Sequence, residues 1–198
     1  SVTNIISMTK KTEEKEALEK WKRENKDSEI ILKESSNRGT LMHGYLSEML
    51  MGKMNGELIE EVNLPKKMAE TIISHGLNDY VKEVYASEEC VYSLKYKYAG
   101  TMDALISTQD NKLQICDFKQ KNSPAKREYS SIRNYFTQCI LYAIAHNEIH
   151  GTKIQSSVIL MCTPNLIFQK FEIEGQEFMD LQKEALERVE HYHQLISK

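Results

Sequence analysis

Residues 100–119 read Gly-Thr-Met-Asp-Ala-Leu-Ile-Ser-Thr-Gln-Asp-Asn-Lys-Leu-Gln-Ile-Cys-Asp-Phe-Lys, two apolar runs separated by a polar Gln-Asp-Asn segment. Turn-forming residues between two strand-like runs predict a hairpin-like pair of strands. Side chains of a strand alternate between its faces, so Asp117 and Lys119 should point one way and Phe118 into the opposite layer. The pairing is expected to bring Asp103 beside Asp117. Two carboxylates on neighbouring strands suit a hard divalent cation.

The two acids and the lysine together predict a metal centre that hydrolyses phosphodiester bonds. Mg²⁺ or Mn²⁺, held by Asp103, Asp117 and the main-chain carbonyl of Phe118, would polarise a phosphate and lower the pKa of bound water. Lys119 would orient that water or help to deprotonate it, and would offset charge on the phosphorane. The alternative is two solvent-facing acids at strand ends and an ordinary surface lysine. An acid placed directly after an apolar Ile-Cys run favours the metal centre.

Size and composition predict one compact domain. The chain has 198 residues and 40% hydrophobic content, which is enough for one core and too little for two comfortable ones. A formal charge of -3 and a pI near 6.1 argue against a broadly cationic protein, so any contact with nucleic acid requires a local basic patch. No apolar run reaches the length of a membrane span, and no secretory signal is evident. We therefore expect a soluble intracellular protein.

The four cysteines favour buried, reduced thiols. They lie more than twenty residues apart, mostly in apolar runs, and form no Cys-x-x-Cys pair of the kind that binds zinc or an iron-sulfur cluster. These residues are Cys90, Cys116, Cys139 and Cys162.

Hydrophobic periodicity predicts an α/β fold. Capping residues before Thr40 and a proline at position 65 mark helix starts. We expect one domain over residues 1–198, mainly helical over 1–80 and sheet-containing over 81–198. The expected helices are 11–25, 41–54, 66–77, 130–149 and a terminal helix from about 176, and the expected strands are 81–97, 100–108, 112–118, 153–162 and 166–171.

Three motifs in order resemble the successive motifs of the PD-(D/E)xK nuclease superfamily in its RecB-like branch: Gly-Thr-Met-Asp at 100–103, Asp-Phe-Lys at 117–119 and Gln-Cys-Ile-Leu-Tyr at 138–142. Arg-Gly-Thr-Leu-Met-His at 38–43 is similar to the Gly-x-x-x-His segment of that branch. The opening residues, the Trp21 helix and the motif spacing are most similar to the mitochondrial genome maintenance exonuclease family and related phage exonucleases. The resemblance covers nearly the whole chain. It implies a restriction-endonuclease-like core, with a central mixed sheet flanked by helices and an N-terminal helical segment.

The resemblance also implies roles for further residues. It makes His43 a metal ligand together with Asp103 and Asp117. Gln138 and Tyr142 lie one helical turn apart, and the resemblance implies that they brace the lysine or hold a phosphate. Taken without it, His43 would be an ordinary helix histidine and Tyr142 a core residue.

Three other acids are left outside the predicted site. Relatives often carry an acid four residues after the histidine, whereas this chain has Ser47 there and Glu48 one residue later, which leaves a second helical acid open. Glu88 and Glu89 precede the strand at 91–98 and could touch the site, but the pattern favours a solvated turn for both, and neither is assigned to catalysis.

Basic and aromatic residues just after Lys119 predict a DNA-binding lip beside the metal. Cations there would contact phosphates, and tyrosines would stack on unpaired bases. The alternative is a solvated loop with tyrosines in the core. The predicted DNA-binding residues are Arg38, Lys121, Lys126, Arg127, Tyr129, Arg133 and Tyr135.

The function that the resemblance implies is a Mg²⁺- or Mn²⁺-dependent DNA exonuclease that acts on single-stranded ends in replication, repair or recombination. Related enzymes with an iron-sulfur cluster carry clustered C-terminal cysteines, and this chain has only Cys162 there, so no cluster is expected. A monomer without membrane contact is expected, in a host cytoplasm if phage-encoded or in a mitochondrion if organellar. The alternatives are a structure-specific endonuclease of the same fold and a catalytically silent nucleic-acid-binding protein. Cleavage polarity and the choice between DNA and RNA stay open.

Overall fold

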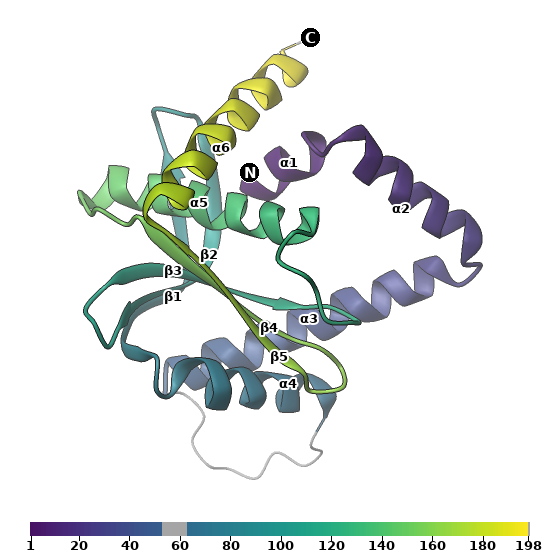
Figure 1. Ribbon diagram of the computed structural model, residues 1–198, viewed down its shortest axis with the longest axis horizontal. Coiled ribbons are helices and arrows are strands. Elements are labelled where there is room, and N and C mark those ends of the chain that lie inside the picture. Colours follow the sequence, from purple (N-terminus) through teal and green to yellow (C-terminus); the bar gives the residue numbers. More distant parts are fainter. Residues whose placement is uncertain (53–62, 198) are drawn as a thin grey trace.

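The computed structural model describes residues 1–52 and 63–197. Its centre is a mixed five-stranded sheet in the order β1-β2-β3-β4-β5 (Figure 1). Neighbouring strands are antiparallel except β3 and β4, which are parallel and joined through a long helix, α5. The strands are β1 (Val81–Ser93), β2 (Tyr98–Thr108), β3 (Leu113–Gln120), β4 (Ser156–Cys162) and β5 (Phe168–Glu174). The α/β prediction with a central mixed sheet is confirmed.

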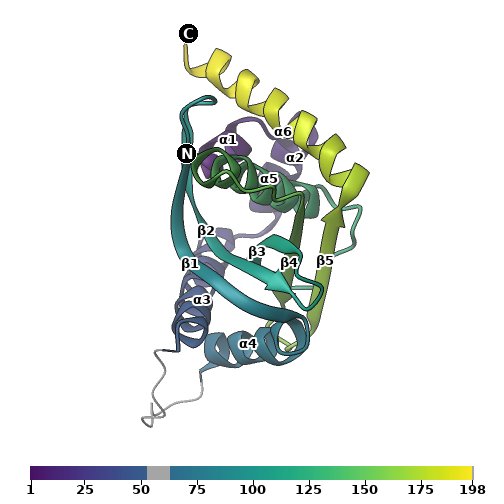
Figure 2. The ribbon, with the colours of Figure 1, turned by 90° about the vertical axis from the view of Figure 1, so that its left-hand side faces the viewer.

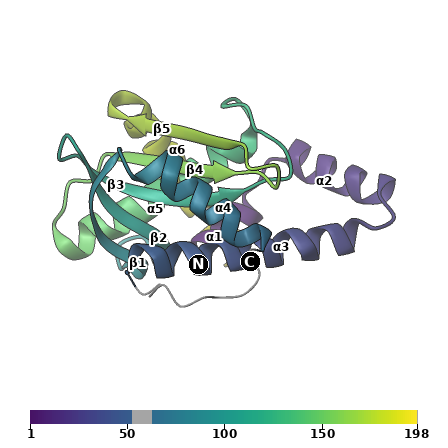
Figure 3. The same cartoon turned by 90° about the horizontal axis from the view of Figure 1, so that it is seen from below.

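Helices cover both faces of this sheet. Figure 2 shows α1, α5 and α6 on one side and α3 and α4 on the other, and Figure 3 shows α3 and α4 in front of the strands. A π-helical turn, Ile73–Leu77, continues α4. The helices are α1 (Val2–Met8), α2 (Thr12–Glu24), α3 (Ser28–Leu50), α4 (Leu64–Ile72), α5 (Ser130–His150) and α6 (Gly175–Ile196).

Two hydrophobic clusters fill the two layers. Ile115 of β3 belongs to the cluster beneath α5 and α6, whereas Cys116 and Phe118 belong to the cluster beneath α3 and α4. This alternation confirms that Phe118 points away from the layer of its neighbours Asp117 and Lys119. The hairpin between β2 and β3 is also confirmed, with the left-handed residue of its turn at Asn111 (φ 60°).

The predicted start of the helix at 41–54 was wrong. Helix α3 begins at Ser28, so the polar segment before Thr40 is helical and does not cap a later helix. Serine and asparagine are only mildly unfavourable in helices, and Ser35 and Arg38 gain hydrogen bonds to Gln120 at the end of β3. The predicted end of this helix, residue 54, lies outside the described residues.

Several strand limits also differ from the prediction by a few residues. Strand β1 ends at 93 before a turn at 94–97, β4 begins at 156, and β5 covers 168–174. The predicted helices at 11–25 and 130–149 are confirmed within one residue at each end.

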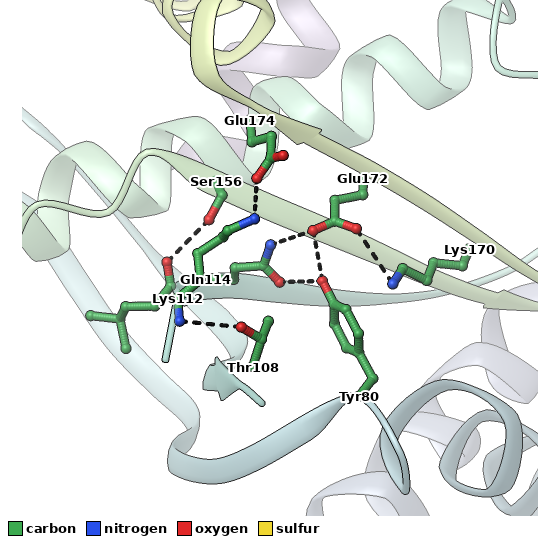
Figure 4. A network of polar contacts seen from close by, with 9 residues as sticks. Tyr80, Thr108, Lys112, Gln114, Ser156, Lys170, Glu172 and Glu174 are labelled. Carbon is green, nitrogen blue, oxygen red and sulfur yellow. Dashed lines mark hydrogen bonds and ion pairs between the residues drawn. The ribbon is translucent and has the colours of Figure 1, made fainter. Parts of the chain in front are cut away.

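A polar network fastens the start of β3 to β5 (Figure 4). The amide of Gln114 donates to Glu172 Oε1 at 2.7 Å, and Tyr80 Oη lies 2.8 Å from the same oxygen and 2.6 Å from Gln114 Oε1. The ammonium of Lys170 lies 3.3 Å from the centre of the Tyr80 ring. Gln114 is fully buried, so these partners replace the water that its amide loses on folding.

Candidate metal centre

Asp103 and Asp117 meet where β2 and β3 stop pairing. The last pair of the ladder is Ala104 with Cys116, so the two acids are the next residues on their strands. The main-chain N–H of Phe118 donates instead to Asp103 Oδ2 at 2.7 Å. A buried N–H requires an acceptor, and the Asp103 side chain provides one. The carboxylate of Asp103 is thereby fixed against the β3 segment that carries Asp117 and Lys119.

Asp117 is fully buried, and its nearest charged neighbour is Lys119. The ammonium of Lys119 lies 2.6 Å from Asp117 Oδ2, yet within the described chain neither carboxylate oxygen of Asp117 has a partner with hydrogen-bond geometry. Burial raises the pKa of Asp117 to about 7, although the charge of Lys119 opposes that shift. Burial also disfavours the ammonium of Lys119, but Asp117 and Asp103 outweigh burial and raise its pKa. Lys119 is therefore held as a cation.

His43 reaches this group from α3. Its Nδ1 lies 3.6 Å from Asp103 Oδ1 and 3.9 Å from Glu88 Oε1. Burial disfavours protonation of the imidazole, but Glu88 and Asp103 outweigh burial and raise its pKa above the usual value. One ligand atom from each of these three residues lies within 4.8 Å of the other two. A helix on one face of the sheet and two strands thus converge on one point.

The prediction that Glu88 lies in a solvated turn was wrong. Glu88 belongs to β1 and lies between Ser87 and Glu89, whose partners on β2 are Ala104 and Met102. It is therefore placed across from Asp103. Its backbone is left-handed (φ 54°), which is unusual for a residue that is not glycine. Glu89 belongs to a different surface, with Oε1 3.8 Å from His150 Nε2 at the end of α5.

The residues present fit a hard divalent cation. One imidazole nitrogen and several carboxylate oxygens are ligands that such ions accept. The observation specific to this site is Asp117, because within the described chain this buried carboxylate has only the ammonium of Lys119 beside it, and a bound cation would satisfy its other oxygen. The main-chain carbonyl of Phe118 stays a prediction, since the contact recorded at that residue uses its N–H.

A cleft of about 640 Å³ leads to this group along α3. His43 and Glu88 line this cleft, and so do Gly39 and Gly44, which have no side chains to fill it. Glu48 is exposed and lines the same cleft, but it is outside the three-residue ligand cluster. The helical acid that the sequence left open is therefore near the site without joining it.

Gln138 and Tyr142 contact each other on α5, as their spacing predicts. Gln138 Nε2 donates to Tyr142 Oη at 2.9 Å. Tyr142 is 2% exposed and packs against Gly100, where an added Cβ would lie 2.7 Å from its ring. Burial raises the pKa of Tyr142, and the nearby Asp117 adds to this. The phenol lies in the core, and the catalytic role of both residues stays a prediction.

Two of the predicted DNA-binding arginines turn toward α6. Arg127 pairs with Glu177 at 2.6 Å, and Arg133 pairs with Glu184. These acids compensate the arginine charges, so the structure does not join the predicted residues into one basic lip. Each role in DNA binding stays a prediction.

The other predicted DNA-binding residues lie nearer to β3. Lys121 donates to Ser131 Oγ at 3.0 Å, and Lys126 is exposed. Tyr129 is 44% exposed, whereas Tyr135 is half-buried with its ring centre 5.2 Å from the ammonium of Lys119. Arg38 hydrogen-bonds to Gln120 at 2.9 Å.

No family model matches this chain, and no curated protein matches it in sequence. A crystal structure from Eubacterium rectale, whose name carries a provisional exonuclease assignment, is similar, with a TM-score of 0.52 and 18% identity. The match covers 78% of this chain and 64% of that one, so this chain spans less than two thirds of that protein. An alkaline exonuclease from Laribacter hongkongensis has a TM-score of 0.34 and 12% identity, over 78% of this chain and 80% of its own. None of the helices in the part of the chain that is described has both the length and the apolar character of a membrane span. The similarity to the first structure supports the fold, a restriction-endonuclease-like core of a mixed sheet flanked by helices.

Proposed function

We propose that this protein is a divalent-metal-dependent deoxyribonuclease that works as an exonuclease on single-stranded DNA ends. The observation that carries the proposal is the convergence of His43, Glu88 and Asp103 on one point, with Asp117 and Lys119 on the β3 segment that Asp103 contacts. Four side chains that can ligate a cation and one fixed ammonium form the set that metal-assisted phosphodiester hydrolysis requires. The similarity in fold to a protein named as an exonuclease agrees with this reaction class.

The chain's own residues divide the work of the reaction. His43, Glu88, Asp103 and Asp117 would hold Mg²⁺ or Mn²⁺. The ion would polarise a phosphate oxygen and lower the pKa of a water molecule. Lys119, which its acidic neighbours keep protonated, would orient that water and offset the charge of the pentavalent phosphorus. Its raised pKa favours this electrostatic role over that of a general base.

The surroundings of the site suggest where a DNA strand would run. The cleft along α3 gives access from the side of His43 and Glu88. On the opposite face, a pocket of about 250 Å³ is lined by Tyr135 and Gln138. Tyr135 would stack on an unpaired base there, and Gln138 with Tyr142 would brace the lysine side of the site.

The remaining predicted contacts fall into two groups. Lys126 and Tyr129 follow β3 and are exposed, so they could meet phosphates and bases, whereas Lys121 would first have to leave Ser131. Arg127 and Arg133 would first have to leave their acidic partners on α6. We propose that the protein acts as a monomer in DNA replication, repair or recombination.

Digestion of three end-labelled or closed substrates tests the proposal. The protein would be incubated with Mg²⁺ or Mn²⁺ and single-stranded linear, duplex linear and covalently closed circular DNA. We expect loss of the linear single strand and survival of the closed circles. Cleavage of closed circles would show that the protein is an endonuclease of the same fold and not an exonuclease. No cleavage of any substrate, with the ion bound, would indicate a silent nucleic-acid-binding protein.

A further inference from the structure

Two polar contacts fasten α3 to the sheet, and each lies one residue from the metal centre. The first joins Ser35 and Arg38 to Gln120, which follows Lys119 on β3. The second joins Ser47 to Ser87, which precedes Glu88 on β1, at 3.2 Å between the hydroxyl oxygens. His43 lies on α3 between these two contacts.

The contact at Gln120 uses both ends of its amide. Its Nε2 donates to the carbonyl and to the hydroxyl of Ser35, both at 2.9 Å, and its Oε1 accepts from Arg38 Nε at 2.9 Å. Arg38 also reaches the side chain of Asn122. Because the Gln120 amide is bonded at both ends, it fixes how far α3 lies along its axis, and how it is rotated about that axis, relative to β3.

The geometry of α3 makes this contact relevant to the metal ligands. At 1.5 Å per residue, His43 lies about 7.5 Å along the helix from Arg38 and about 6 Å from Ser47. If α3 slid along its axis or rotated about it, His43 would therefore be displaced by nearly the same amount. The imidazole lies 3.6 Å from the nearest oxygen of Asp103, and a displacement of about 1 Å is enough to disrupt a site of this kind.

We propose that Arg38 and Gln120 are positioning residues that set the distance between His43 and the carboxylates of the metal centre. On this view Arg38 is not a DNA contact, in contrast to the role expected from its sequence. Its guanidinium is already engaged by Gln120 and Asn122. The proposal rests on the proposed metal centre, but it does not depend on the identity of the nucleic-acid substrate.

Mn²⁺ binding in the absence of DNA tests this role directly. Isothermal titration would compare the wild type with Arg38→Ala, Gln120→Ala and the double variant. We expect each single change to weaken Mn²⁺ binding roughly tenfold, as loss of a residue that orients a metal ligand does. The double variant should lose little more than either single variant, because both changes break the same contact.

A salt titration of DNA binding separates this role from phosphate contact. With Ca²⁺ in place of Mn²⁺ to suppress cleavage, Arg38→Ala should keep the wild-type dependence of DNA affinity on salt concentration. Lys33→Ala is the matched control, since Lys33 is exposed on α3 and makes no side-chain hydrogen bond within the described residues. It should bind Mn²⁺ as the wild type does.

Wild-type Mn²⁺ affinity in Arg38→Ala would overturn the proposal, and a salt dependence reduced by about one phosphate contact would make Arg38 a DNA contact instead. If the alanine variants lose their helical circular dichroism, Arg38→Lys decides, since it keeps the charge and the aliphatic stem but not the planar fork. We expect Arg38→Lys to bind Mn²⁺ more weakly, and unchanged affinity would again overturn the proposal.

A wild type that binds Mn²⁺ but cleaves no DNA would refute the proposed function, while the Mn²⁺ comparison still decides the role of Arg38. A wild type that binds no Mn²⁺ would refute both.

Discussion

Replacing Asp117 by asparagine should abolish cleavage and yet stabilise the ion-free protein. Asp117 is fully buried, and in the described parts of the chain its carboxylate has only the ammonium of Lys119 beside it, 2.6 Å from Oδ2. Asparagine has nearly the same shape and no charge. The substitution therefore removes the cost of burying a charge without opening a cavity, while the cation loses a ligand.

The size and sign of the effect follow from the pKa of this carboxyl group. It rises from the usual 3.8 to about 7 in the folded protein. Between these two values the folded state binds more protons than the unfolded state, so the free energy of unfolding falls as the pH rises and is lowest above about pH 7. At about 1.4 kcal/mol for each unit of pKa, the full loss is at most about 4 kcal/mol. Lys119 stays protonated throughout this window and does not change the sign.

Urea denaturation of wild type and Asp117→Asn in EDTA measures this difference. At pH 8 the variant should be more stable by up to about 4 kcal/mol, and the advantage should shrink toward pH 4, where wild-type Asp117 is protonated. Excess Mn²⁺ should shrink the variant's advantage by stabilising the wild type, by about 3 kcal/mol at a hundred times its Kd, and the variant much less. A variant that is no more stable than the wild type at pH 8, or an advantage that does not depend on pH, would refute the reasoning.

Three further substitutions test separate parts of the structure. Lys119→Ala should abolish cleavage in a gel assay, while Mn²⁺ titration still shows binding. The reason is that the ammonium of Lys119 acts on the phosphate and is not a metal ligand. Cleavage at the wild-type rate would show that Lys119 has no part in the mechanism. Glu88→Gln should weaken Mn²⁺ binding roughly tenfold to a hundredfold, whereas Glu89→Gln, which alters the neighbouring acid on another surface, should not; equal effects would count against Glu88 as a ligand. Gly100→Ala should lower the free energy of unfolding by about 1–3 kcal/mol in urea, because the new Cβ would lie 2.7 Å from a buried tyrosine ring. Gly44→Ala, which has open space and removes a helix glycine, should be neutral or slightly stabilising, and the reverse order would contradict this account of packing.

Local patterns were sufficient for the part of the site carried by β2 and β3. Alternation along one strand placed Asp117 and Lys119 on one face, and a short turn made the pairing that brings Asp103 close. Both rules operate over a few residues, so they hold without knowledge of the rest of the fold. The long helix at 130–149 was predictable for the same reason, since its apolar residues recur over many turns.

Glu88 was beyond the reach of such patterns. Its place across from Asp103 depends on the register of the β1–β2 hairpin, which runs unbroken from the pair Ser93 and Tyr98 to the pair Ala86 and Leu105. A shift of one residue exchanges the faces of a strand. Had the register been known from the pairing of Val91 with Gly100, counting back would have placed Glu88 at the site.

The ion pairs of Arg127 and Arg133 were beyond local patterns for a different physical reason. Their acidic partners on α6 are about fifty residues away in the sequence, and only the packing of α6 beside α5 brings them near. A run of basic residues thus loses its excess charge through tertiary contacts that no local pattern contains. The start of α3 was missed on similar grounds, because its first turns gain hydrogen bonds from the distant end of β3.

The two fully buried polar side chains of β3, Gln114 and Asp117, differ in a way that separates structure from function. Gln114 is fully buried and bonded to Glu172 and Tyr80, as a polar residue retained for stability should be. Three residues along the same strand, Asp117 is as deeply buried but has only the adjacent ammonium of Lys119. A well-packed apolar residue would be more stable there, since a buried ion pair seldom repays the loss of hydration. A carboxylate kept at such a cost makes sense where a cation binds, and the stability of Asp117→Asn with and without Mn²⁺ measures that cost directly.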